Sequence, residues 1–140
     1  MTPFNVRIYG LLVHENRLLI IREPFAGMII DKFPGGGLEY GEGTRDCLKR
    51  EFKEELNLEI EVHEHIYTQD FFLASRFDEN EQILMIYYKV TAKDIAQLEI
   101  LDSDIQALIW KDLNEVTTKD LSLPTDKLVL EMVVGGEFEV

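Results

Sequence analysis

A proline followed by three glycines, residues 34–37, separates a part of the chain that predicts strands from a part that predicts a helix. Proline lacks a backbone donor and glycine is too flexible for the interior of a regular element, so this segment predicts a tight connection. The helix expected after it runs from about residue 45 to Leu56, with Thr44 as its N-terminal cap. Asn57 then fits the left-handed position that follows a helix end.

Strand-like segments dominate the rest of the chain. Residues 24–32 predict a loop, and Pro124 starts a second helix that ends before Gly135. Two helices far apart in sequence among many strands indicate an α+β fold, in which helices cover a mixed sheet. The length of 140 residues suits one domain, residues 1–140. The predicted strands are residues 6–13, 18–23, 58–68, 70–77, 82–92 and 105–111.

Charge and composition exclude several classes of function. The net charge of −13, from 27 acidic and 14 basic residues, opposes binding to a long nucleic acid. A small phosphorylated ligand is compatible, because a divalent cation can neutralise a local cluster of acids. No segment has the roughly 18 to 20 apolar residues of a membrane span, and no secretory signal precedes the first strand. Cys47 is the single cysteine, so no internal disulfide can form, and we expect a cytoplasmic protein without membrane contacts.

The first predicted helix gathers three glutamates, Glu51, Glu54 and Glu55, on one side. Like charges at these spacings destabilise an isolated helix by roughly 0.2 to 0.5 kcal/mol per pair. Glu55 also adjoins the apolar stripe, where partial burial raises the pKa of a carboxyl group. A solvated acidic face is the alternative, but the nearby glycines favour a Mg²⁺ site, because they let the backbone approach closely and offer a carbonyl ligand.

Residues 36–58 resemble the Nudix box, the signature of the Nudix hydrolases. That signature reads G, five residues, E, seven residues, R-E, an apolar residue, any residue, E-E, any residue, G, then an apolar residue. Gly36, Glu42 and residues 50–55 occupy the defining positions, and Asn57 replaces the last glycine. Asparagine tolerates the same left-handed conformation. The resemblance implies an α/β/α sandwich, with a mixed sheet between helices.

The resemblance also implies an activity. Nudix hydrolases cleave a diphosphate linkage in nucleoside diphosphates joined to another group, with Mg²⁺ or Mn²⁺ bound. Glu51 and Glu55 are then metal ligands, and Glu54 is a ligand or the base that orients water. Arg50 and Glu42 would form an orienting salt bridge. The predicted catalytic residues are thus Glu54, Glu55, Glu51 and Arg50, and the predicted metal ligands are Gly35, Glu51, Glu54, Glu55 and Asp104, with Asp102 as the alternative to Asp104.

Substrate-binding residues must lie outside the box. Arg7 and Arg22 are predicted to contact phosphate, and Phe72 to stack on a base. For each, an ordinary surface or core position is the alternative, and we expect at least one of Phe71 and Phe72 in the core. The expected substrate is a small nucleotide derivative: a nucleotide sugar, ADP-ribose, a dinucleoside polyphosphate or an oxidised nucleoside triphosphate. The apolar residues 28–30 could line the pocket or pack in a homodimer.

Two other functions are compatible with the same fold. A non-catalytic nucleotide sensor is the main alternative, although such relatives usually lose glutamates of the box and this chain retains them. An isomerase of isoprenoid diphosphates is the other, and Cys47, inside the helix beside the acids, is poorly placed for that role.

Overall fold

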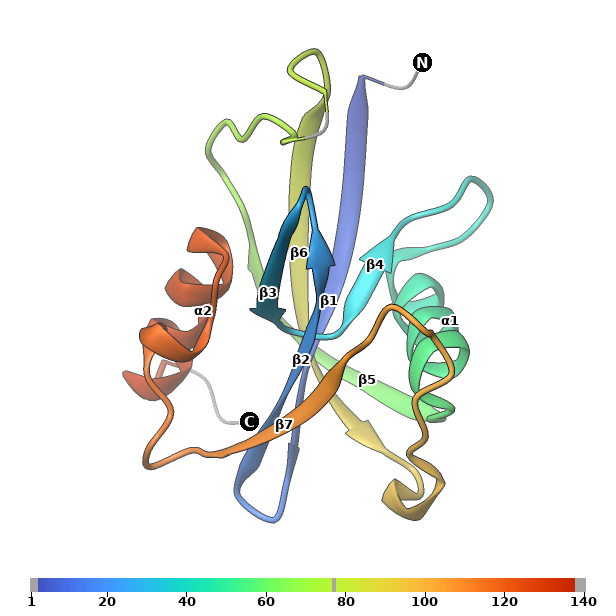
Figure 1. Cartoon of the computed structure of the whole chain (residues 1–140), viewed down its shortest axis with the longest axis vertical. Helices are drawn as coiled ribbons and strands as arrows, with labels where there is room; N and C mark the ends of the chain where they lie inside the picture. Colours follow the sequence, from blue (N-terminus) through green and yellow to red (C-terminus); the bar gives the residue numbers. More distant parts are fainter. Residues whose placement is uncertain (1–2, 77, 138–140) are drawn as a thin grey trace.

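The computed structural model describes residues 3–76 and 78–137. Within them, seven strands form one mixed sheet, and the helices α1 (Thr44–Leu56) and α2 (Pro124–Val134) lie on opposite sides of it (Figure 1). Short 3-10 turns occur at Ile95–Gln97 and Thr118–Asp120. This arrangement confirms the predicted α+β class. No helix in the described ranges is long and apolar enough to span a membrane.

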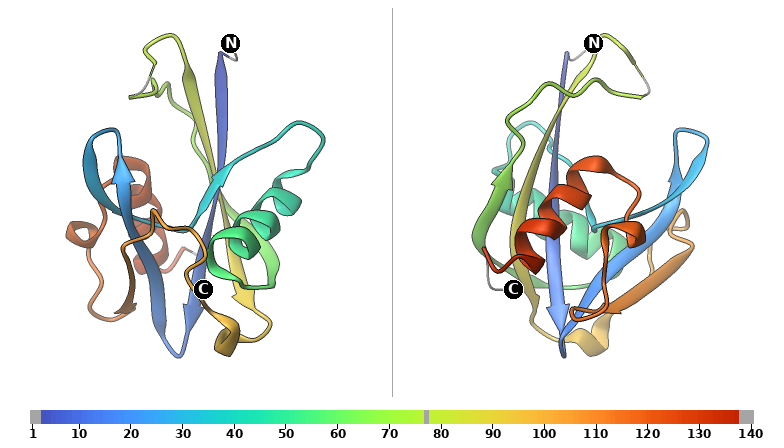
Figure 2. Two further views of the ribbon diagram at one scale, coloured as in Figure 1. Left: turned by 45° about the vertical axis from the view of Figure 1, so that its right-hand side comes forward. Right: turned by 90° about the vertical axis from the view of Figure 1, so that its left-hand side faces the viewer.

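The long strand β1 (Phe4–His14) organises the sheet. One edge pairs in parallel with β6 (Gln82–Ala92), and β5 (Ile60–Thr68) extends the sheet antiparallel to β6. The other edge pairs with β2 (Arg17–Phe25) only next to the connecting turn. Beyond that point β2 diverges from β1, as Figure 2 shows, and leaves an edge of β1 that another strand can use.

The predicted loop at residues 24–32 is wrong. β2 continues to Phe25, and β3 (Met28–Lys32) returns antiparallel to it. The turn consists of Ala26 and Gly27, with φ values of 49° and 80°. A two-residue turn with both φ values positive matches the twist of its strands, so an Ala-Gly pair closes this hairpin. The strand β7 (Ala107–Asp112) pairs with the other edge of β2.

The three glycines form a short strand, β4 (Gly35–Gly37), although the sequence predicted only a connection. β4 pairs antiparallel with residues 7–9 of β1, on the edge that β2 leaves free. Gly35 has a φ of 149°, and a Cβ there would collide with the backbone oxygen of Ile8. Pairing therefore requires glycine at this position, because any side chain would push β4 away from β1.

The helix α1 differs from expectation at its start and agrees with it at its end. Thr44 is its first residue, not its cap, and its hydroxyl lies 2.6 Å from the hydroxyl of Tyr88 on β6. The hydroxyl thus ties the helix to the sheet rather than to its own first turn. Asn57 adopts the left-handed conformation, with φ 55° and ψ 28°, which confirms the prediction for this position.

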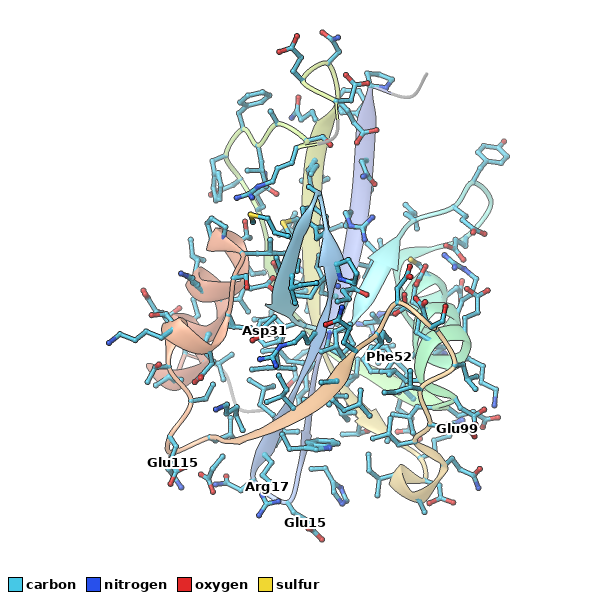
Figure 3. All side chains as sticks on the ribbon, viewed as in Figure 1. Glu15, Arg17, Asp31, Phe52, Glu99 and Glu115 are labelled. Atoms are coloured by element: carbon cyan, nitrogen blue, oxygen red, sulfur yellow. The ribbon has the colours of Figure 1, made fainter. Side chains whose placement is uncertain are left out.

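Two apolar clusters fill the space on the two sides of the sheet, because neighbouring residues of a strand face opposite ways. Ile8 of β1 packs in the cluster under α1, whereas Tyr9 packs in the cluster under α2. Phe52, labelled in Figure 3, lies between α1 and the strands and is 1% exposed. The other members that the helices contribute to these clusters are Cys47, Leu48, Leu56, Val129, Leu130 and Val133.

A strand at residues 70–76 is absent from the described chain, apart from a single bridge between Ala74 and Gln82; Phe77, the last residue of that prediction, lies outside the described residues. The side chain of Gln69 bonds instead to backbone groups, donating to the Phe71 oxygen at 2.6 Å. Both Phe71 and Phe72 are exposed, so the expectation that one of them fills the core is also wrong.

We predict that Gly35→Ala destabilises the protein by more than about 2 kcal/mol, because its Cβ must separate β4 from β1. Gly41→Ala is the matched control: its φ is also positive, at 93°, but a Cβ there would meet no described atom within 4 Å beyond its chain neighbours. The control should lose only about 1 kcal/mol. Urea denaturation measures both, and equal losses would contradict the close approach of β4.

Candidate active site

Arg50 is the centre of the acidic cluster. Its guanidinium donates to both carboxylate oxygens of Glu42, at 2.7 and 3.0 Å, and to the backbone oxygen of Gly37 at 3.0 Å. It also donates to Glu51 at 2.9 Å and to Glu54 at 3.2 Å. One cation therefore fixes the loop before α1, the strand β4 and two carboxylates of the helix.

Glu42 forms the strongest of these contacts. Hydrogen bonds from Arg50 and from the Glu39 amide lower the pKa of Glu42 to about 2. The salt bridge that the sequence predicted between Arg50 and Glu42 is present, and it is bidentate, the geometry in which guanidinium and carboxylate pair best.

Glu51 lies against β4. A Cβ added to Gly36 would fall 2.5 Å from the Glu51 carboxyl group, so the missing side chain at this position leaves the space that the carboxylate fills. The Glu51 side chain is 12% exposed. The glycine strand thus brings its backbone next to an acidic side chain that is largely removed from water.

Glu55 is the most perturbed acid of the cluster. Burial and the neighbouring charge of Glu51 raise the pKa of Glu55 to about 8. This matches the expectation that a carboxylate adjoining the apolar stripe is held in an unfavourable environment. Glu54 differs, because its side chain is 60% exposed and faces water.

The donor set fits a hard cation. Glu51, Glu54 and Glu55 offer only oxygen atoms, as Mg²⁺ prefers, and Gly36 lets the Glu51 carboxylate lie close to the backbone of β4. Successive carbonyls of a strand point to opposite edges, so the Gly35 oxygen points to the same side as the Gly37 oxygen that Arg50 binds. In the described ranges no group of three or more acidic, cysteine or histidine side chains is arranged to hold a metal ion, and Glu51 and Glu54 are bonded to Arg50.

The loop with the two predicted aspartates covers the end of α1. The Leu101 amide donates to the backbone oxygen of Glu55 at 2.8 Å. Asp102 closes a turn by accepting from the Asp104 amide at 2.9 Å. Asp104 is exposed in a loop that reaches the end of α1, and its role as a ligand stays a prediction.

Sequence reasoning missed two charged residues next to the cluster. Lys32 of β3 and Glu23 of β2 form an ion pair, with Nζ 3.4 Å from Oε1, and both interact electrostatically with Glu55. The signal that could have found them is a charged residue at a position of the hairpin where alternation predicts burial. The assignment of residues 24–32 to a loop concealed that alternation.

An apolar pocket lies beside this cluster and encloses about 530 Å³, its open mouth included. Arg7 lines it and donates to the hydroxyl of Tyr9 at 2.8 Å. The guanidinium of Arg7 also interacts electrostatically with Glu51, so it lies between pocket and acids. The lining residues are Arg7, Tyr9, Phe25, Leu73, Ala74, Arg76, Ile83, Met85, Leu123, Pro124 and Thr125.

Two predicted substrate contacts lie elsewhere. Arg22 donates to both carboxylate oxygens of Asp31 on β3, at 2.8 and 3.0 Å, so its charge is already paired; Asp31 is labelled in Figure 3. Phe72 is 72% exposed and is not among the described residues that line the pocket, whereas Phe25 is. Of the three predicted contacts, the fold brings only Arg7 to the pocket.

Comparison with known proteins gives consistent matches. The NUDIX domain profile matches residues 1–132. The uncharacterized Nudix hydrolase YvcI of Bacillus subtilis is 24% identical over 127 residues, which cover 91% of this chain and 77% of that protein. The solution structure of the E. coli ORF135 protein aligns with a TM-score of 0.73 at 22% identity, covering 93% of this chain and 88% of the other. A MutT NUDIX hydrolase from Burkholderia pseudomallei also has a TM-score of 0.73, at 19% identity, covering 94% and 99%.

The lowered pKa of Glu42 predicts a pH dependence of stability. A carboxyl group whose folded pKa is about 2, below the ordinary 4.5, stabilises the fold above pH 4.5, and this contribution disappears as the pH falls through 2. Glu42→Gln should therefore lower the Tm at pH 6 and have little effect near pH 2. Thermal melts across this range measure the difference. Glu59→Gln, at an exposed position, is the control, and a Tm difference for Glu42→Gln that does not vary with pH would contradict the interpretation.

Proposed function

The chain belongs to the Nudix family of pyrophosphohydrolases, and we propose that it cleaves the diphosphate linkage of a small nucleotide derivative with Mg²⁺ bound. The observation that carries this proposal is the group of box glutamates on one side of α1, of which Arg50 binds Glu51 and Glu54, with Glu51 packed against the glycine strand. Clustered, partly buried carboxylates cost stability unless cations balance them. Arg50 and Lys32 do so only in part, because burial and the charge of Glu51 still raise the pKa of Glu55 to about 8, and this favours a metal ion as a further cation.

In this proposal Glu51, Glu55 and the Gly35 carbonyl hold the cation, with Glu54 and Asp104 as further ligands. Mg²⁺, or Mn²⁺ in its place, would supply positive charge for the phosphate oxygens and lower the pKa of a bound water. Arg50 remains bonded to Glu42 and keeps the helix and the glycine strand at a fixed separation.

The other side chains of the site have separate roles in this proposal. Glu54 is exposed to solvent, which suits a residue that orients the attacking water and accepts its proton. Arg7 is placed to bind a phosphate oxygen, because it lines the pocket and interacts with Glu51. The apolar pocket then holds the organic part of the substrate, with Phe25 and Tyr9 as aromatic surfaces.

The substrate is expected to be one of four kinds: a nucleotide sugar, ADP-ribose, a dinucleoside polyphosphate or an oxidised nucleoside triphosphate. A panel of these compounds, assayed for phosphate release with added phosphatase in Mg²⁺ and in Mn²⁺, tests the proposal. No turnover of any compound, together with thermal stabilisation by one of them, would favour the nucleotide sensor instead.

Three further points, the isomerase alternative, the cytoplasmic location and a homodimer, each rest on one or two residues. The thiol of Cys47 is buried, and burial raises its pKa to about 12, which argues against a reactive cysteine and hence against the isomerase. A free thiol suits the reducing cytoplasm. Met28 and Ile29 are about half exposed and could pack in a homodimer, whereas Ile30 is buried in the chain itself.

We predict that Glu55→Gln lowers turnover more than about a hundredfold, because it removes a carboxylate from the cation site. Glu54→Gln should lose about a hundredfold and flatten the pH profile of kcat, as expected for loss of a general base. Glu131→Gln, at an exposed position of α2, should keep full activity. Full activity of Glu55→Gln would remove it from the catalytic set, and an unaltered pH profile of Glu54→Gln would argue against its role as base.

The two arginines predicted to bind phosphate should differ. Arg7→Met is expected to raise KM about tenfold or more, since a charge-assisted contact to phosphate is lost. Arg22→Met should change KM less than about twofold, because its guanidinium is bonded to Asp31, outside the pocket. Steady-state kinetics on the best substrate of the panel measure both. A larger effect of Arg22→Met would place the phosphate on the other side of the β2–β3 hairpin.

A further inference from the structure

Lys32 has an unusual environment. Its side chain is 2% exposed, and its Nζ is the one buried side-chain nitrogen or oxygen of the described residues without a hydrogen-bond partner. The nearest acidic atom, Oε1 of Glu23, lies 3.4 Å away and does not complete a hydrogen bond. A buried ammonium with three unused donors is costly, and such groups in native proteins require an explanation.

The position of Lys32 suggests what its donors are for. Nζ lies 4.7 Å from the centroid of the Tyr9 ring, which lines the pocket, and Lys32 interacts electrostatically with Glu55 of the catalytic helix. Arg7 reaches the same place from β1, through its bond to the Tyr9 hydroxyl. Two cations from different strands therefore lie close to Tyr9, which lines the pocket, and each interacts electrostatically with a box glutamate, Lys32 with Glu55 and Arg7 with Glu51. A diphosphate that joins the two parts of a substrate would pass this place.

We propose that Lys32 is a phosphate ligand whose place near the substrate is occupied by Glu23 when no substrate is bound. This inference rests on the proposed function, since it assigns the ammonium to a non-bridging oxygen of the diphosphate. The carboxylate of Glu23 is 17% exposed, so it can turn toward solvent when a phosphate replaces it beside Nζ. A phosphate oxygen then completes the hydrogen bonds that Glu23 leaves unmade.

A purely structural ion pair makes a different prediction. If Lys32 and Glu23 only stabilised the hairpin, removing either partner would break the same contact and have the same effect on ligand binding. If Glu23 competes with phosphate for Lys32, the two substitutions act in opposite directions. Loss of the ammonium weakens anion binding, and loss of the competing carboxylate strengthens it.

The test is calorimetric titration of the full chain with inorganic pyrophosphate in Mg²⁺. Lys32→Met should weaken binding about tenfold or more, and Glu23→Gln should strengthen it severalfold. Lys111→Met is the matched control, because Lys111 also forms a 3.4 Å ion pair, with Asp120, but outside this site; its affinity should stay within about twofold of the wild type. On a hydrolysed nucleotide, Lys32→Met should raise KM more than it lowers kcat.

Three results would overturn the inference: unchanged pyrophosphate affinity in Lys32→Met, equal weakening in both variants, or no binding by the wild type. If Lys32→Met does not fold, the wild type can be tested by NMR instead. The inference expects the ¹⁵N signal of the Lys32 ammonium to shift when pyrophosphate is added, and an unchanged signal would overturn the inference. The proposed function fails separately. A chain that binds pyrophosphate through Lys32 but hydrolyses no nucleotide would retain this inference and lose that function.

Discussion

The site depends on one guanidinium. Arg50 bonds at once to the loop before α1, to the backbone of β4 and to two glutamates of the helix. Without such a cation, the carboxylates on one helical face would repel one another and turn away from the glycine strand. Arginine suits this task better than lysine, because its planar fork satisfies several acceptors in fixed directions and keeps its charge. The same bonds that stabilise the acids therefore also set the distance between helix and strand.

Local signals in the sequence were sufficient for the end of the helix and for the side on which its acids lie. The spacing of acids and apolar residues placed Glu55 against the core, and Asn57 marked the helix end because few residues adopt positive φ readily. Thr44 was misassigned as a cap because its partner, Tyr88, lies on a strand 44 residues away in sequence. Propensities describe neighbours along the chain and contain no information on such a partner.

The strands depend even more than the helix on contacts between residues far apart in sequence. Consecutive glycines have low strand propensity, and β4 forms only because β2 leaves an edge of β1 unpaired and glycine alone fits beside Ile8. Likewise, the buried charge of Lys32 becomes visible only when β3 is seen to fold back on β2. The box could thus be predicted from sequence, whereas the pocket and the charges that join it to the box are products of tertiary packing.

The parallel pairing of β1 with β6 has a consequence for how the protein is made. Phe4 pairs with Gln82 and Leu12 with Val90, so β1 is synthesised nearly eighty residues before its partner strand. Contacts so distant in sequence close large loops and slow folding. Until β6 is synthesised, the β1 edge of the apolar β1–β2 hairpin is unpaired and can form hydrogen bonds with strands of other chains. Synthesis is therefore a stage at which β1, still without β6, can associate with other chains.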